Sequence, residues 1–137
     1  WLFPMMAKAL AITPISASLF ASTTTRCGMR SLIRGTGSTL DQDGLELYYR
    51  LATDRAHVDA TLSMMAQWSL DGLLSRLDQI TAHIHLIAGK NDLAVPPSVS
   101  TDAHHALPNS RLTTLSDLGH LAHEEDPKTI ANLILNA

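Results

Sequence analysis

Aromatic side chains are scarce in this sequence of 137 residues, at 4%, so leucine, alanine, isoleucine and methionine must fill the interior. Charged residues are also few, at 17%, while hydrophobic residues reach 45%, which is the composition of a folded domain and not of a disordered chain. The net charge of -3 gives no basic surface for nucleic acid. We therefore expect a folded protein that has no nucleic-acid partner.

Cysteine is nearly absent. Cys27 is the single cysteine, so the chain cannot form an internal disulfide, which favours a reducing compartment and predicts a cytoplasmic location. No His or Lys stands beside Cys27 to activate its thiol, so we interpret it as a structural residue and not as a nucleophile.

A hydrophobic run long enough to cross a membrane is also missing. Lys8 and Pro14 interrupt the apolar stretch 1–20, and no basic run precedes it, so neither a transmembrane segment nor a signal peptide is predicted. Trp1 is not a translation start. We therefore expect the chain to begin inside a longer protein.

The chain has two regions that differ in their predicted secondary structure. Residues 1–78 are expected to form a helical lid, with helices over 5–10, 15–20, 26–34, 44–52 and 71–77, and with Asp41 and Asp54 as helix N-caps. The apolar faces of these helices are expected to turn inward. Residues 79–137 are expected to alternate strand and helix, over 84–88, 98–106, 111–115 and 128–135, the last helix opened by Pro127. This alternation predicts an α/β fold in which the chemistry lies beyond the carboxyl ends of parallel strands.

Asp92 and His120 each follow one of the two predicted strands, so adjacent strands would bring them together. An imidazole held by a carboxylate is the general base of acyl-transfer triads. The alternative interpretations are an Asp that only caps its own turn and a His that only bonds to backbone. We favour the joint interpretation, in which Asp92 is the acid and His120 the base.

The remaining polar residues are assigned structural roles. His123 is expected to be a supporting hydrogen-bonder, and Glu125 or Asp126 to stabilise the start of the last helix. His83, His85, His104 and His105 raise the question of a metal site, but no Cys pair or H-E-x-x-H motif accompanies them. No metal and no cofactor is therefore predicted.

A nucleophile motif is missing. No Gly-x-Ser-x-Gly occurs, and the stretch 35–39, Gly-Thr-Gly-Ser-Thr, has the wrong frame and is interpreted as a loop that ends a helix. A His-Gly segment for oxyanion donors is absent as well. The sequence as it stands lacks the residues to run the reaction.

Two motifs carry a family resemblance. The pattern G-x-x-D-x-x-x-P over 89–96 and the pattern G-H-x-x-x-x-E-x-P over 119–127 resemble the end of an α/β-hydrolase, in which the acid precedes the base. The resemblance implies the C-terminal part of that fold, namely a helical lid plus the last two parallel strands and their helices. It also implies that the nucleophilic serine lies upstream, outside the chain.

Segments of the lid narrow this resemblance. Residues 6–8, 30–38, 45–51 and 64–71, together with 119–127, are similar to the magnesium-chelatase accessory proteins of bacteriochlorophyll biosynthesis, the BchO family. This similarity implies a hydrolase or acyltransferase associated with magnesium insertion into a porphyrin. Met64, Met65 and Trp68 are then candidate substrate-binding residues for an ester or porphyrin-type substrate. Their alternative interpretation is ordinary core filling.

Three interpretations of function follow. The first is a serine hydrolase or acyltransferase that acts with magnesium chelatase and uses Asp92 and His120. The second is a non-catalytic accessory protein that binds a porphyrin or the chelatase itself. The third concerns the isolated chain, which is expected to be inactive and to self-associate through exposed sheet edges.

Overall fold

The computed structural model describes residues 14–136, with side chains from residue 18 onward, so the helix expected over 5–10 lies outside the described residues. The chain divides into two compact units. Among the described residues, the helical unit comprises 14–31 and 41–70, and the strand-bearing unit comprises 32–40 and 71–136. The sequence-based division at residue 78 stays a prediction.

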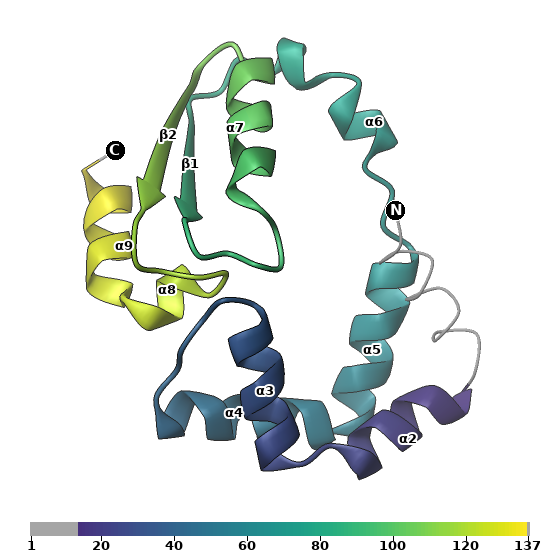
Figure 1. Cartoon of the computed structure of the whole chain (residues 1–137). Helices are drawn as coiled ribbons and strands as arrows, with labels where there is room; N and C mark the ends of the chain where they lie inside the picture. The colour runs from purple at the N-terminus through teal and green to yellow at the C-terminus, as the bar shows by residue number, and fades with distance from the viewer. Residues whose placement is uncertain (1–13, 137) are drawn as a thin grey trace. The chain divides into compact units, whose positions relative to one another are not determined.

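The helical unit contains α2 (Pro14–Thr23), the first turns of α3 (Arg26–Gly35), α4 (Gln42–Thr53) and α5 (Arg55–Ala66) (Figure 1). Helices α2, α4 and α5 contact one another, and Met29 and Val58 are buried. Arg26 joins α3 to α4, because its Nε and Nη2 atoms lie 2.8 and 2.9 Å from the two carboxylate oxygens of Glu46. Its guanidinium also lies 4.3 Å from the ring centre of Tyr49, a cation–π contact.

Aspartate caps set the boundaries of these helices, as the sequence predicts. Oδ1 of Asp41 accepts a hydrogen bond from the amide of Gly44 at the start of α4. Asp54 ends α4 and begins α5, and its Oδ1 accepts the amides of Ala56 and His57. Each cap satisfies amides that have no partner within the helix.

The expected inward turn of the apolar faces is wrong for several helices. The side chains of Leu47 and Leu51 on α4 are about half exposed, and so are Leu70, Leu73 and Leu74 around α6 (Asp71–Leu74). The helix expected over 71–77 is also interrupted: α6 ends at Leu74, and a 3₁₀ helix, η1 (Leu77–Gln79), follows. Arg76 leaves the helical region at φ -133°, which separates the two turns.

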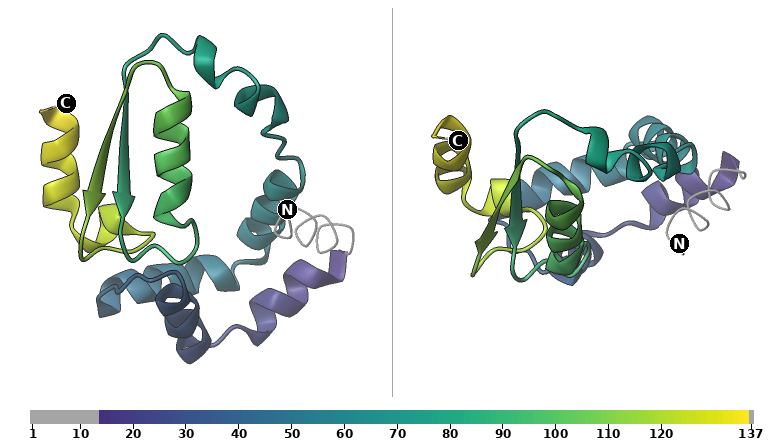
Figure 2. Two further views of the ribbon diagram at one scale, coloured as in Figure 1. Left: turned by 45° about the horizontal axis from the view of Figure 1, so that its top comes forward. Right: turned by 90° about the horizontal axis from the view of Figure 1, so that it is seen from above.

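The strand-bearing unit is built around two parallel strands, β1 (Ile84–Gly89) and β2 (Ser110–Leu115), paired from Ile84–Ser110 to Gly89–Leu115. Helix α7 (Pro97–Ala106) connects the strands and packs against both of them. The short α8 (Ala122–Glu125) and α9 (Pro127–Leu135) follow β2. Figures 1 and 2 show α7 and α9 on opposite sides of the strand pair. The bounds of β1, α7, β2 and α9 agree with the sequence prediction to within one residue at each end, whereas α8 was not predicted.

The carboxyl ends of β1 and β2 point the same way, and the loops after both strands lie at that end (Figure 1). The last turn of α3 and the loop that follows it belong to the same unit. Ala88, Leu107, Ala122 and Ile33 are its buried apolar residues. Among the described helices, none has the length and hydropathy needed to span a membrane.

Candidate active site

Asp92 lies three residues beyond the end of β1 and uses its two carboxylate oxygens differently. Oδ1 accepts the backbone amides of Ala94 and Val95, at 2.9 and 2.7 Å, which closes the turn after the strand. Oδ2 lies 2.9 Å from Nδ1 of His120. The turn-forming role that the sequence left open is therefore present, and it leaves the second oxygen for the histidine.

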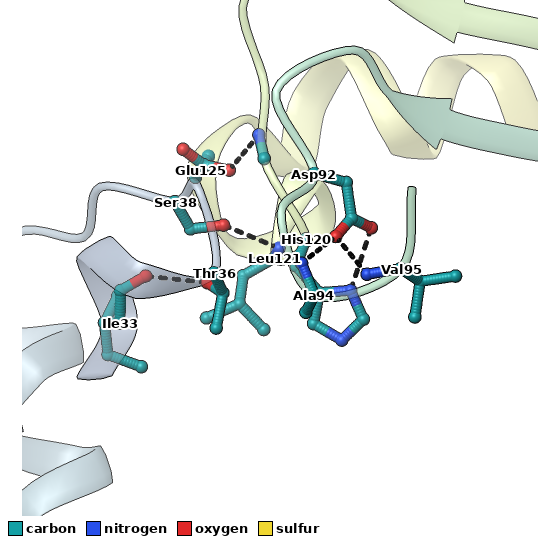
Figure 3. A network of polar contacts seen from close by, with 10 residues as sticks. Ile33, Thr36, Ser38, Asp92, Ala94, Val95, His120, Leu121 and Glu125 are labelled. Atoms are coloured by element: carbon teal, nitrogen blue, oxygen red, sulfur yellow. Dashed lines mark hydrogen bonds and ion pairs between the residues drawn. The ribbon is translucent and has the colours of Figure 1, made fainter. Parts of the chain in front are cut away.

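His120 lies in the loop after β2, at the same end of the strand pair as Asp92. Its side chain is 39% exposed, whereas the side chain of Asp92 is 12% exposed. Figure 3 shows the imidazole with one nitrogen at the carboxylate and the other directed away from it. A neutral ring in this position donates from Nδ1, because the carboxylate can only accept, and Nε2 is then left with its lone pair.

The electrostatics of Asp92 favour its ionised form. Burial acts to raise the pKa of this carboxyl, but the hydrogen bonds from the Val95 amide and from His120 outweigh burial, with support from the charge on His120 and from the Ala94 amide. The pKa of Asp92 therefore lies below its ordinary value. A carboxylate that stays ionised can orient an imidazole and stabilise an imidazolium.

A loop from a distant part of the sequence contacts both of these segments. We call residues 36–39 (Thr-Gly-Ser-Thr) the 36–39 loop. The carbonyl oxygen of Thr36 accepts the amide of Leu93 at 3.1 Å and that of His120 at 3.4 Å. Oγ of Ser38, whose residue is 1% exposed, accepts the amide of Leu121 at 2.8 Å (Figure 3).

Glu125 links the same loop to the segment before His120. Its Oε1 accepts the amide of Thr39 and its Oε2 accepts the amide of Gly119, each at 2.8 Å. The expectation that Glu125 or Asp126 stabilises the last helix is therefore met by Asp126, whose Oδ1 accepts the amide of Thr129 in the first turn of α9. Glu125 has a different task, which sequence reasoning missed.

Three glycines allow these backbones to approach closely. A Cβ at Gly37 would collide with the carbonyl of Asn91, and Gly37 has a φ of 83°, a conformation that other residues rarely adopt. A Cβ at Gly119 would collide with the backbone of Gly37, and one at Gly89 would collide with the carbonyls of Leu118 and Gly119. The 36–39 loop, the His120 loop and the end of β1 are thus stacked backbone against backbone.

The Asp92–His120 pair borders a small cavity of about 160 Å³, which Val95, Ser100 and Ile130 also line. Ligand pockets usually measure about 300–1,000 Å³. This space has room for a few water molecules or a small group. The described residues around the pair therefore supply an acid and a base, and not a complete substrate pocket.

The candidate lid residues lie in the helical unit. Met64 and Met65 are in the last turn of α5, and Trp68 follows that helix. Met64 and Trp68 are half exposed, so neither is ordinary core filling in the described part of the chain. A cavity of about 290 Å³ in the same unit has an apolar lining that does not include them: Phe20, Met29, Tyr48, Leu51, Ala52, His57, Val58, Thr61 and Leu62.

Three of the other histidines contact polar groups of the protein. Nδ1 of His104 lies 2.7 Å from Oγ of Ser110, and Nε2 of His85 lies 2.8 Å from Oγ1 of Thr113. Nε2 of His123 lies 3.4 Å from the carboxylate of Glu124. Within residues 14–136, no group of three or more His, Cys, Asp or Glu side chains is placed to hold a metal ion.

The role of the 36–39 loop is the feature that the sequence did not reveal. The interpretation of residues 35–39 as a loop that ends a helix is confirmed, since α3 ends at Gly35. Its hydrogen bonds, between Ser38 and Leu121 and between Thr39 and Glu125, join residues that are separated in the sequence by 83 and 86 positions, respectively. The cluster of Gly, Thr and Ser in a short stretch was the available signal, because small residues permit close backbone contact.

Comparisons with known proteins found similar sequences and a similar fold. No protein-family model matches the chain. The chain is 42% identical to the magnesium-chelatase 30 kDa subunit of Rhodobacter capsulatus over 137 residues, which cover 98% of this chain and 47% of that protein. It is 36% identical over 59 residues to RutD of Escherichia coli, whose name describes a candidate carbamate hydrolase, and the match covers 43% of this chain and 22% of that protein.

A solved esterase from Exiguobacterium antarcticum has a similar fold, with a TM-score of 0.69 and 13% identity over 97% of this chain and 47% of the esterase. The chain spans less than half of the length of each of these three proteins. The α/β-hydrolase fold class and the resemblance to the chelatase accessory family are confirmed. By sequence the chain is similar to the magnesium-chelatase 30 kDa subunit, and its fold is that of the matching part of an α/β-hydrolase.

Proposed function

We propose that this chain carries the acid, Asp92, and the base, His120, of a serine-hydrolase triad in a cytoplasmic protein that acts with magnesium chelatase. The observation that carries the proposal is the 2.9 Å contact between Oδ2 of Asp92 and Nδ1 of His120, at the carboxyl ends of two adjacent parallel strands. The nucleophilic serine and the oxyanion donors would come from outside these 137 residues. The substrate class is an ester or a porphyrin-type molecule.

In this mechanism the second ring nitrogen of His120 performs the proton transfers. Nε2 takes the hydroxyl proton of the serine as its oxygen bonds to the carbonyl carbon of the ester. The same nitrogen then gives the proton to the leaving alcohol as the ester C–O bond breaks. Asp92 holds the ring in the Nδ1–H tautomer and stabilises its positive charge between the two transfers.

The comparisons support the setting of this proposal and leave the substrate open. The Rhodobacter capsulatus relative is named as a subunit of magnesium chelatase, and two further relatives are named as a hydrolase and an esterase. Asp92 and His120 have the order and placement of the acid and base of a triad, which fits the names of the hydrolase and the esterase. The Rhodobacter capsulatus relative, which is matched over 98% of this chain, supports the association with magnesium chelatase.

A graft tests the catalytic proposal directly. The 137 residues replace the aligned stretch of the Rhodobacter capsulatus subunit, and hydrolysis of p-nitrophenyl acetate is measured as the probe reaction. We expect turnover by the graft and a loss of about 10⁴-fold or more in kcat with His120→Ala. The matched control is His105→Ala, which removes an exposed histidine of α7 in the same unit. Equal turnover by the graft and its His120→Ala variant would contradict the triad assignment.

The second candidate function is a non-catalytic accessory protein that binds a porphyrin or the chelatase. Two features of the helical unit favour it, namely the apolar cavity of about 290 Å³ and the exposed side chains of Met64 and Trp68. Titration of the chain with protoporphyrin, followed by Trp fluorescence, tests for binding. Binding that Val58→Trp abolishes, together with full stimulation of chelatase by the His120→Ala graft, would favour this second function over hydrolysis.

A further inference from the structure

We propose that Glu125 is a positioning residue, and that with the 36–39 loop it forms a clamp that holds the acid loop against the base loop. The clamp deepens the proposed function, since its effect on turnover rests on the triad assignment. Its effect on the geometry of His120 does not depend on that assignment. All the contacts that form the clamp lie within the strand-bearing unit.

The 36–39 loop is bonded to both catalytic segments. The carbonyl of Thr36 accepts the amide of Leu93, which follows Asp92, and also the amide of His120 itself. A single oxygen thus bridges the two loops. Ser38 adds a third link through the amide of Leu121, and its burial excludes water that could replace this bond.

Glu125 closes the clamp from the other side. Its two oxygens accept the amides of Thr39 and Gly119, so one carboxylate fixes the end of the 36–39 loop to the residue before His120. Hydrogen bonds to a charged acceptor are about twice as strong as those between neutral groups. A glutamine could accept only one of the two amides, because its NH₂ group would face the other N–H.

The glycine stack makes this clamp stiff. Gly119 lies against the backbone of Gly37, and Gly89 lies against the backbone of Leu118 and Gly119, so no side chain separates these segments. A shift of the 36–39 loop must therefore displace the His120 loop as well. Misplacement of a catalytic group by about 1 Å can cost about 10²-fold in rate.

The experiment measures which ring nitrogen of His120 carries the proton in the 137-residue chain. Long-range ¹H–¹⁵N spectra of the labelled protein report which ring nitrogen carries the proton, and His120→Ala assigns the signal. We expect the Nδ1–H form in the unmodified chain. With Glu125→Ala, and in part with Glu125→Gln, we expect His120 to become a mixture of tautomers with a faster-exchanging Nδ1 proton.

Two controls separate positioning from general stability. Asp126→Asn weakens the cap of α9 next to Glu125 and should lower stability while it leaves the His120 signal unchanged. If Glu125→Ala does not fold, Glu125→Gln keeps one acceptor oxygen and decides the matter. An unchanged Nδ1–H population in Glu125→Gln, or an equal change in Asp126→Asn, overturns the clamp.

Kinetics of the graft distinguish failure of the clamp from failure of the triad. We expect Glu125→Gln to lower kcat by about tenfold to 10²-fold with little change in KM, because the binding groups are not altered. A graft that is inactive while Glu125→Gln still changes the His120 tautomer would remove the hydrolase proposal and leave the clamp. An active graft, together with a His120 tautomer that Glu125→Gln leaves unchanged, would remove the clamp and leave the hydrolase proposal.

Discussion

Nδ1 of His120 lies 2.9 Å from Oδ2 of Asp92, although 28 residues separate them in the sequence. The other oxygen of Asp92 is held by the amides of Ala94 and Val95, so the carboxylate cannot rotate freely. The orientation of the imidazole is therefore fixed by a side chain that is itself fixed by backbone. This arrangement leads to the first prediction.

Asp92→Asn should reverse the tautomer of His120. The two backbone amides need an acceptor, so the Asn carbonyl oxygen would face Ala94 and Val95 and its NH₂ group would face His120. Nδ1 would then have to accept, and the proton would move to Nε2, where it blocks attack on a hydroxyl. We expect the Nε2–H form in ¹⁵N spectra and a loss of about 10⁴-fold in kcat of the graft. Retention of the Nδ1–H form in this variant would refute the argument.

The lowered pKa of Asp92 predicts a loss of stability in acid. Because the folded-state pKa is below the value of about 4 for an unfolded Asp, the ionised carboxylate stabilises the folded chain above that pH. This contribution disappears as the pH falls through the lower folded-state value. Urea unfolding should therefore show the stabilities of the unmodified chain and of Asp92→Asn converging as the pH falls from about 4 through the folded-state pKa of Asp92. A stability difference between the two proteins that stays constant over the whole acid range would contradict this prediction.

The lowered pKa of His85 predicts a second pH range in which the stability of the chain changes. Burial first, then the charges of Arg111 and His83, place the pKa of His85 below its ordinary value. Its Nδ1 accepts from Arg111, so the folded chain favours the neutral ring. Stability from this group is present above about pH 6.5 and is lost as the pH falls toward the folded-state value.

The measurement for His85 is urea unfolding between pH 7.5 and pH 5, with His85→Gln compared to the unmodified chain. Glutamine does not titrate, so the variant should lose less stability over this range. His105→Gln, on the exposed face of α7, is the matched control and should keep the pH dependence of the unmodified chain. An equal slope for all three proteins would rule out His85 as the source.

Two glycines at the end of α3 should respond in opposite ways to alanine. Gly37→Ala places a Cβ against the carbonyl of Asn91 in a conformation with positive φ, so we expect a loss of about 2–4 kcal/mol. A Cβ at Gly35 meets nothing within 4 Å, and this residue is helical, so Gly35→Ala should stabilise by up to about 1 kcal/mol. Urea unfolding of both variants checks the contrast, and similar midpoints would contradict the close contact of the 36–39 loop.

The isolated chain is expected to self-associate. Within the described residues β1 and β2 form a sheet of two strands, so each has one edge without a strand partner. Leu93, Val95 and Val99 near the end of β1 are also exposed. Sedimentation at increasing protein concentration should show growth beyond the monomer. A chain that stays monomeric throughout would refute this expectation.

Local chemistry in the sequence determined the elements and the principal pair. Asp41 and Asp54 cap helices because their side chains can bond to amides a few residues away, and Pro127 opens α9 because it lacks an amide that a helix start does not need. The spacing of Asp92 and His120 after two strands predicted their contact, because parallel neighbours end at the same edge.

Only the tertiary structure decided what surrounds this pair. No pattern in the sequence pairs Thr39 with Glu125 or Ser38 with Leu121, because such bonds depend on which distant loops meet and not on neighbouring residues. The burial of each helix face was likewise undetermined: Leu47 and Leu51 have the spacing of a buried face yet are exposed. A periodic apolar face shows that a helix can be covered, but the other elements of the fold decide whether it is.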